Sequence, residues 1–116
     1  MSKRSVGSEY EALAARFLEK EGYTILEKNF CCRQGEIDLI AREGEYLCFV
    51  EVKYRTSRHS GDALEAVTPL KQSRIIRTAR VYLMVRGLGE EIKCRFDVVG
   101  IMPGNIRLVR DAFSLG

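Results

Sequence analysis

The sequence has no long apolar run, and its cysteines and histidine are too few and too poorly spaced for a zinc site. No stretch approaches the roughly 20 apolar residues of a membrane span, and no apolar segment follows the basic N-terminus MSKRSVGS. We therefore expect a cytoplasmic protein without a membrane partner. Cys31 and Cys32 are adjacent, whereas Cys48 and Cys94 stand in apolar runs, so we expect four structural thiols and no zinc.

The composition contains no linker, repeat or low-complexity tract. With 116 residues, of which 46% are hydrophobic and 30% charged, the chain is expected to form a single domain over residues 1–116, with residues 1–7 as a flexible N-terminal arm. The net charge of +3 permits nucleic-acid binding without requiring it. Arginines are concentrated in the middle of the chain, where they either meet phosphates or form a solvated helix face, and composition alone favours the solvated face.

Apolar residues at helical spacing predict two helices. The first extends from Ser8, as its N-cap, to Gly22, and the second begins at Thr68 and Pro69 and ends at Arg86–Gly87. Strand-like segments are expected at 23–28, 35–42, 46–54, 93–101 and 105–111. Because a helix connects the third and fourth strands, some pairing should be parallel, and the fold class is α/β with a mixed sheet.

Charged residues interrupt the apolar pattern of the second and third strands, GEIDLIAREGEYLCFVEVKYR. A symmetrical turn at Glu43–Gly44 would place Asp38 opposite Phe49 and gather Asp38, Glu51 and Lys53 on one face of the sheet. Two neighbouring carboxylates repel one another unless a cation lies between them, and oxygen ligands suit Mg²⁺ or Mn²⁺. Alternatively, these residues form ordinary ion pairs on an exposed strand face, and Glu-x-Lys alone does not distinguish the two interpretations.

Other charged residues are candidates for the same site. Glu11 lies on the flank of the first helix's apolar stripe, and Lys71 lies one turn before Ile75 on the core-facing row of the second helix. Glu11 is otherwise a solvated first-turn residue, and Lys71 a surface lysine whose stem packs on the protein. Arg55 extends the third strand towards a phosphate or a carboxylate.

Three more polar residues have open roles. His59, the only histidine, stands in the polar loop TSRHSGD, where an exposed position is the simpler interpretation. Asp97 follows Phe96 in a strand-like run and is left outside the metal set, and the role of Glu36 is also open.

The motifs EALAARFLEKEGY, GEIDLIA, FVEVKYR and RFDVV together resemble the YraN-like family of bacterial proteins. More broadly, the arrangement is similar to the PD-(D/E)XK nuclease superfamily, which includes archaeal Holliday-junction resolvases. The resemblance implies a restriction-endonuclease-like αβββαβ core. It also implies that Asp38 and Glu51 bind Mg²⁺ or Mn²⁺, that Lys53 is the catalytic lysine, and that Glu11 is an additional helical carboxylate of the active site.

Two functions from different classes follow as expectations. The first is a metal-dependent endonuclease acting on DNA, including branched or junction DNA, in which a basic loop and helix hold the phosphate backbone. The basic residues assigned to this contact are Arg55, Arg58, Lys71 and Arg74. The alternative is a non-catalytic nucleic-acid-binding module on a nuclease fold, and a third interpretation is a plain structural domain. Symmetric cutting of both strands would favour a homodimer.

Overall fold

In the residues that the structure describes, a five-stranded sheet carries one helix on each face. The computed structural model describes residues 3–55, 67–89 and 91–114, and only the backbone of residues 3–8. The elements follow the order α1 (Lys3–Lys20), β1 (Thr24–Cys32), β2 (Gly35–Glu43), β3 (Tyr46–Tyr54), α2 (Pro69–Val85), β4 (Cys94–Met102) and β5 (Asn105–Phe113). This order confirms the α/β class and the succession of elements predicted from the sequence.

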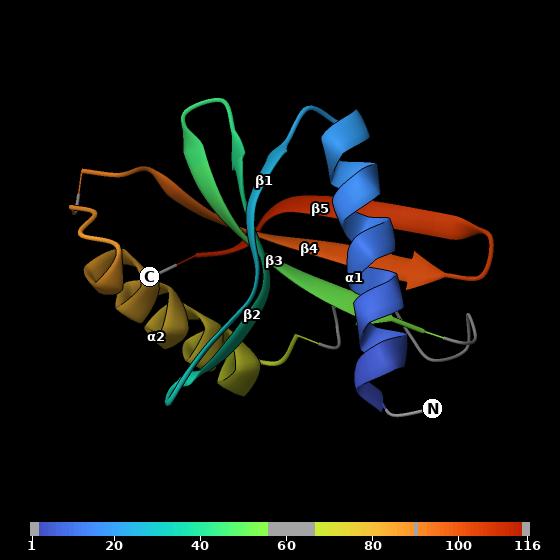
Figure 1. Cartoon of the computed structure of the whole chain (residues 1–116), viewed down its shortest axis with the longest axis horizontal. Coiled ribbons are helices and arrows are strands. Elements are labelled where there is room, and N and C mark those ends of the chain that lie inside the picture. Colours follow the sequence, from blue (N-terminus) through green and yellow to red (C-terminus); the bar gives the residue numbers. More distant parts are fainter. Residues whose placement is uncertain (1–2, 56–66, 90, 115–116) are drawn as a thin grey trace.

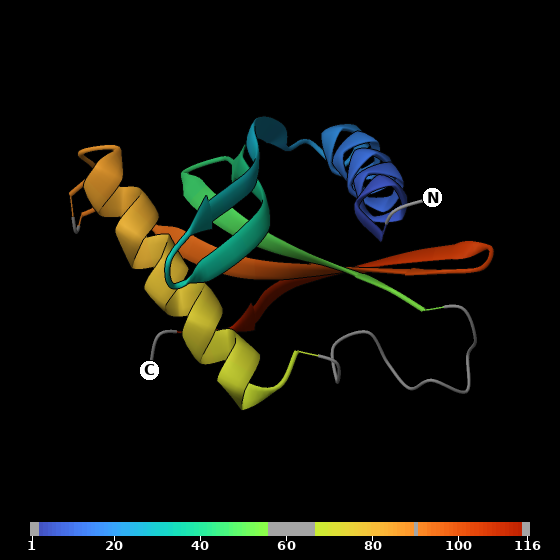
Figure 2. The ribbon, with the colours of Figure 1, turned by 60° about the horizontal axis from the view of Figure 1, so that its bottom comes forward.

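The strands lie in the sheet in chain order, β1-β2-β3-β4-β5 (Figure 1). Every neighbouring pair is antiparallel except β3 and β4, which are parallel. A parallel pair requires a long connection between its strands, and α2 lies in that connection. The prediction of a mixed sheet is therefore confirmed. Figure 2 shows α1 and α2 on opposite sides of the sheet.

Local sequence accounts for the ends of α2. The hydroxyl of Thr68 accepts a hydrogen bond from the Lys71 N–H at 3.3 Å, and Pro69 occupies the first turn, where its missing N–H has no helical partner to lose. The helix ends at Val85, and Gly87 follows with φ 67°. Both predicted ends of this helix are confirmed.

The first helix begins earlier than predicted. α1 starts at Lys3, so Ser8 lies within it and is not its N-cap, and the helix includes most of the segment that we expected to be an arm. Once packing has formed a helix, adding another turn costs little, because only nucleation is unfavourable. The predicted stop is confirmed, since Gly22 follows the helix with φ 102°. Neither described helix is long and apolar enough to cross a membrane.

Both faces of the central strands are buried. Leu39 and Val50 pack beneath Leu18 of α1, whereas Ile40 and Phe49 pack beneath α2. Strands that are covered on both faces are expected to be continuously apolar, as β2 and β3 are in their central parts. The charged residues at one end of these two strands are therefore the exceptions that need an explanation.

The hairpin between β2 and β3 differs in register from the prediction. The turn consists of Gly44 and Glu45, and the ladder runs from Glu43↔Tyr46 to Leu39↔Val50. The prediction that Asp38 faces Phe49 is wrong, because Ile40 occupies that place and Asp38 lies towards Glu51. Glu43 stays in the strand because its carboxylate accepts hydrogen bonds from two arginines. Since the shift is two residues, each side chain keeps its predicted face.

A buried ion network joins β4 and β5 to Tyr23, which follows α1. Asp97 is fully buried and accepts hydrogen bonds from the Tyr23 hydroxyl at 2.7 Å and from Arg95 Nε at 2.9 Å. The backbone N–H of Asp111, which has φ 54°, donates a hydrogen bond to Oδ1 of Asp97 at 2.9 Å. Arg95 and Arg110 both donate to Glu43. Asp97 thus has a structural role, which agrees with leaving it outside the predicted metal set.

Replacing Asp97 with Asn should destabilise the fold strongly. The substitution keeps the shape of the side chain but removes the fully buried one of the two carboxylates, Asp97 and Glu43, that pair with Arg95, whose side chain is only 13% exposed. Breaking a buried pair of this kind costs about 3 kcal/mol. Urea unfolding measures the loss. Glu45→Gln is the control, because the Glu45–Lys93 pair is exposed, and an equal loss in both variants would contradict this account.

Candidate active site

The strands β2 and β3 separate at the point where the charged residues begin. Their regular ladder ends at Leu39↔Val50. Beyond it, Oδ2 of Asp38 accepts a hydrogen bond from the backbone N–H of Val52 at 2.8 Å. A side-chain carboxylate thus takes the place of a backbone carbonyl in the ladder. This bond fixes the direction of the Asp38 side chain without needing any other side chain.

Glu51 and Lys53 directly precede and follow Val52 in β3, and their side chains lie on the opposite face of the strand from the Val52 side chain. Nζ of Lys53 lies 3.2 Å from Oε1 of Glu51, and the two side chains are only 14% and 15% exposed, respectively. Glu51 also lies close enough to Asp38 for the charge of Asp38 to raise the pKa of Glu51. The structure therefore brings together the three residues that the sequence predicted, although through a different register.

Burial and mutual repulsion disturb the protonation of the two carboxyl groups. Burial, followed by the charge of Asp38, raises the pKa of Glu51 to about 7, although Lys53 opposes the shift. Burial also raises the pKa of Asp38, while the Val52 N–H and Glu51 oppose it. Near neutral pH, the pair therefore holds a proton that separate surface carboxylates would have lost.

Glu11 reaches the same site from α1. Burial, followed by the charge of Asp38, raises the pKa of its carboxyl group. The amide orientation of Asn29 that satisfies both side chains places Nδ2 at 2.5 Å from Oε1 and 3.2 Å from Oε2 of Glu11. Glu36 is exposed nearby, and its charge raises the pKa of both Glu11 and Asp38. Carboxylates from α1, β2 and β3 thus converge.

Basic side chains lie on the other side of Lys53. Lys71, in the first turn of α2, lies close to Lys53. The ammonium group of Lys53, followed by burial, lowers the pKa of Lys71. Arg55 adds to this positive charge, and its Nε is buried with no hydrogen-bond partner among the described residues. Arg74 is exposed one turn further along α2. Arg58, which we also predicted to contact nucleic acid, lies outside the described residues.

His59 likewise lies outside the described residues.

Arg86 is one of the arginines concentrated in the middle of the chain, but the structure assigns it to an ion pair, because its Nη2 lies 2.6 Å from Oε1 of Glu27. Its guanidinium also lies 5.3 Å from the ring centroid of Tyr82. Arg86 therefore has structural partners.

The acidic residues suit a hard divalent cation. No group of three or more His, Cys, Asp or Glu side chains is arranged to hold a metal within the described segments. Mg²⁺ needs only one or two carboxylates when water and substrate phosphates supply its remaining ligands, and Asp38 and Glu51 provide these two. A cation would also replace the proton that this pair retains. The residues therefore fit Mg²⁺ or Mn²⁺.

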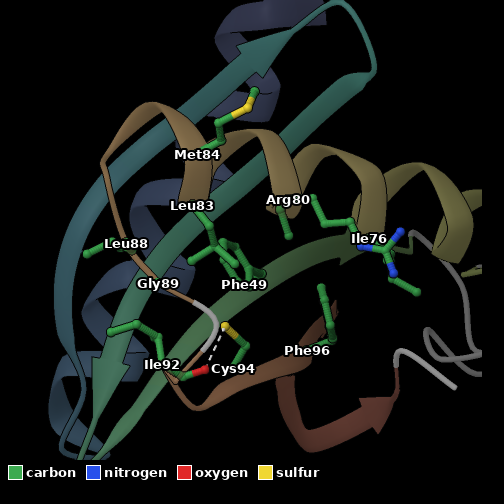
Figure 3. Close-up of a pocket in the computed structure, with 11 residues that line it drawn as sticks. Phe49, Ile76, Arg80, Leu83, Met84, Leu88, Gly89, Ile92, Cys94 and Phe96 are labelled. Carbon is green, nitrogen blue, oxygen red and sulfur yellow. Dashed lines mark hydrogen bonds between the residues drawn. The ribbon is translucent and has the colours of Figure 1, made fainter.

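A separate cavity of about 590 Å³ lies between the C-terminal half of α2 and the sheet (Figure 3). Phe49, Leu83 and Phe96 contribute to its apolar lining, and Arg80 is its one charged side chain. None of the predicted site residues that the structure describes lines it. Cys94 contributes a thiol to the lining, but no carboxylate or histidine accompanies it among the described lining residues, so the carboxylate cluster is the better candidate for an active site.

Comparison with known proteins identifies the family. Residues 10–101 match the model of the "Uncharacterised protein family UPF0102". The chain belongs to this family. A UPF0102 protein of Lachnoclostridium phytofermentans is 50% identical over 98% of this chain and 97% of its own length. A UPF0102 protein of Chlorobium chlorochromatii is 50% identical over 92% of this chain and 79% of its own length. The resemblance to the YraN-like family is thereby confirmed.

Sequence analysis missed Asn29 as part of the site. The predicted strand ended at Lys28, whereas β1 continues to Cys32 and carries Asn29 to the carboxylate of Glu11. One signal was present, because Asn is depleted in strands and an Asn between Lys28 and Phe30 therefore needs a local reason. The N–H of Val52 could not be found in this way, since every residue but proline has a backbone N–H.

Replacing Glu51 with Gln should stabilise the protein at alkaline pH. The folded state raises the pKa of Glu51 from 4.5 to about 7, so its ionisation is disfavoured by folding. The resulting penalty is absent below about pH 4.5, grows as pH rises through this window and is complete above about pH 7. Glu51→Gln should remove a penalty of about 2–3 kcal/mol at pH 8.

Urea unfolding at pH 4.5, 6 and 8 would measure this difference for wild type, Glu51→Gln and the exposed control Glu45→Gln. The advantage of Glu51→Gln should grow with pH, and the control should follow the wild type at every pH. A Glu51→Gln variant that is less stable at pH 8 than at pH 4.5, relative to wild type, would contradict the raised pKa.

Proposed function

We propose that the protein is a metal-dependent endonuclease that hydrolyses phosphodiester bonds in DNA. The half-buried pair of Asp38 and Glu51 beside Lys53 carries this proposal. Two adjacent, half-buried carboxyl groups with raised pKa values reduce stability, and such groups are concentrated at functional sites. The PD-(D/E)XK resemblance supports the same conclusion, because it assigns metal binding to Asp38 and Glu51 and catalysis to Lys53.

Asp38 and Glu51 would hold Mg²⁺ or Mn²⁺, with Asp38 kept in place by the Val52 N–H. When bound, the metal supplies positive charge to the phosphoryl oxygens and a water molecule of lowered pKa. Lys53, which already contacts Glu51, would orient the attacking water and stabilise negative charge on the phosphoryl group. Glu11 adds a carboxylate beside Asp38.

The basic residues beside this cluster would bind the DNA backbone. Lys71 and Arg55 lie next to Lys53, and a phosphate oxygen would give the buried Nε of Arg55 the acceptor that the described residues do not supply. We include Arg58 and Arg74 in the proposed contact because both stand in the same basic segment of the chain. Contacts of this kind position the backbone and do not select a base sequence.

One observation favours the alternative of a nucleic-acid-binding module without catalysis. Lys53 already forms an ion pair with Glu51 at 3.2 Å, so the site has a counter-charge before any metal binds. A site neutralised in this way could retain its fold and its basic surface without hydrolysing DNA. This alternative predicts binding that weakens with salt and persists without Mg²⁺.

Substitutions in the cluster should separate metal binding from catalysis. Asp38→Asn should lose calorimetrically measured Mn²⁺ binding together with cleavage, because one of two metal carboxylates is neutralised. Lys53→Met should retain Mn²⁺ binding but cleave about 100-fold more slowly, the loss typical of removing one stabilising donor. Linear, nicked and four-way-junction DNA would serve as substrates, with Glu45→Gln as the exposed control.

Cleavage by Asp38→Asn at the wild-type rate would refute the assignment. A wild type that binds DNA but cleaves none of the three substrates would favour the binding module. Preference for the junction, together with two-fold cuts and a dimeric mass in solution, would identify the substrate class and the homodimer expected from the resemblance.

Binding of uncleaved DNA, measured without metal, tests the basic surface separately. Lys71→Gln should weaken binding and make the dependence of log K on log salt shallower by about 0.9 for each lost phosphate contact on duplex DNA. Lys93→Gln is a matched control, because Lys93 is a lysine paired with Glu45 on the exposed surface. Equal effects of the two substitutions would show that Lys71 makes no specific phosphate contact.

A further inference from the structure

Asn29 has an unusual backbone for a residue in the middle of a strand. It is one of two residues other than glycine for which a positive φ is recorded in the described part of the chain, with φ 54°. Its neighbours keep the regular ladder, because Lys28 pairs with Leu39 and Phe30 pairs with Ile37. Asn29 therefore stands opposite Asp38 but turns out of the strand conformation at that position.

The second residue of this kind shows what such a turn can achieve. Asp111 has the same φ of 54°, and its backbone N–H donates to the buried carboxylate of Asp97 at 2.9 Å. A positive φ is unfavourable for residues with a Cβ, although Asn and Asp tolerate it best. In β5, the unfavourable conformation directs a donor to a buried carboxylate that would otherwise lose a hydrogen bond.

At Asn29 the conformation directs a side-chain donor to Glu11. Nδ2 reaches both carboxylate oxygens, at 2.5 and 3.2 Å. Glu11 lies beside Asp38 and near Glu36, so the nearby negative charges favour a turn of its carboxylate away from the cluster. The contact with Asn29 opposes that turn. Asn29 thus has an unfavourable backbone conformation at the position from which its side chain reaches Glu11.

We propose that Asn29 is a positioning residue that holds the carboxylate of Glu11 beside the metal-binding pair of Asp38 and Glu51. The inference rests on the proposed function, because it assumes that the cluster binds a divalent cation. Asn29 itself binds neither metal nor substrate. It fixes the orientation of Glu11, and residues that orient acidic groups at metal sites commonly change metal affinity by about 10- to 100-fold.

The test compares Asn29→Gly with Asp111→Gly. Both substitutions place glycine where φ is 54°, so both relieve the backbone, but only the first removes a contact with Glu11. Mn²⁺ affinity is measured by calorimetry, and folding is monitored by circular dichroism and thermal unfolding. Asn29→Gly should bind Mn²⁺ about tenfold more weakly while remaining folded. Asp111→Gly should keep the wild-type affinity.

A double-substitution cycle with Glu11→Gln identifies the route of the effect. If Asn29 acts through Glu11, then Asn29→Gly should change Mn²⁺ affinity little when Glu11 is already Gln. Wild-type affinity in Asn29→Gly, or an equal loss in the Glu11→Gln background, would overturn the inference while leaving the metal centre intact. A wild-type chain that binds no Mn²⁺ would overturn the proposed function itself, so the two failures are distinguishable.

Discussion

The hydrogen bond from the Val52 N–H to the Asp38 carboxylate is the contact on which the site depends. It occupies the position where β2 and β3 stop pairing through their backbones. Because the bond ties Asp38 to the residue between Glu51 and Lys53, three charged side chains are placed together by one backbone donor. The same separation of strands opens the sheet beside α1 and α2, from which Glu11 and Lys71 reach the cluster.

Charge is distributed unevenly between two neighbouring clusters of the sheet, and the two clusters have different consequences. Near Tyr23, the buried Asp97 receives hydrogen bonds from donors of several elements, and every charge has a partner. Near Asp38, carboxylates lie against carboxylates, and their pKa values are raised. The first arrangement stabilises the sheet, whereas the second lowers its stability. The sheet thus combines a cluster of paired charges with a neighbouring cluster where a cation or a phosphate would improve the balance of charge.

The ends of α2, and the grouping of Asp38, Glu51 and Lys53 in one site, could be predicted from the sequence because each has a local signal. Thr68 and Pro69 are typical of a helix start, and Asp38, Glu51 and Lys53 interrupt apolar strands. The predicted hairpin register was wrong because Gly44 fits either of two turn positions. The choice between them depends on Arg95 and Arg110, the distant partners of Glu43. Asn29 could not be assigned to Glu11 for the same reason, since that contact joins β1 to α1 across the fold.

The most direct test of the metal centre is a count of the protons released when Mn²⁺ binds. Calorimetric titrations at pH 6.5, in two buffers with different ionisation enthalpies, give this number from the difference in observed heat. Because the pKa of Glu51 is about 7, the metal should displace the proton held by Glu51 and Asp38, and about one proton should be released. A binding heat that does not depend on the buffer, or the absence of any binding heat in both buffers, would contradict a cation site at this pair.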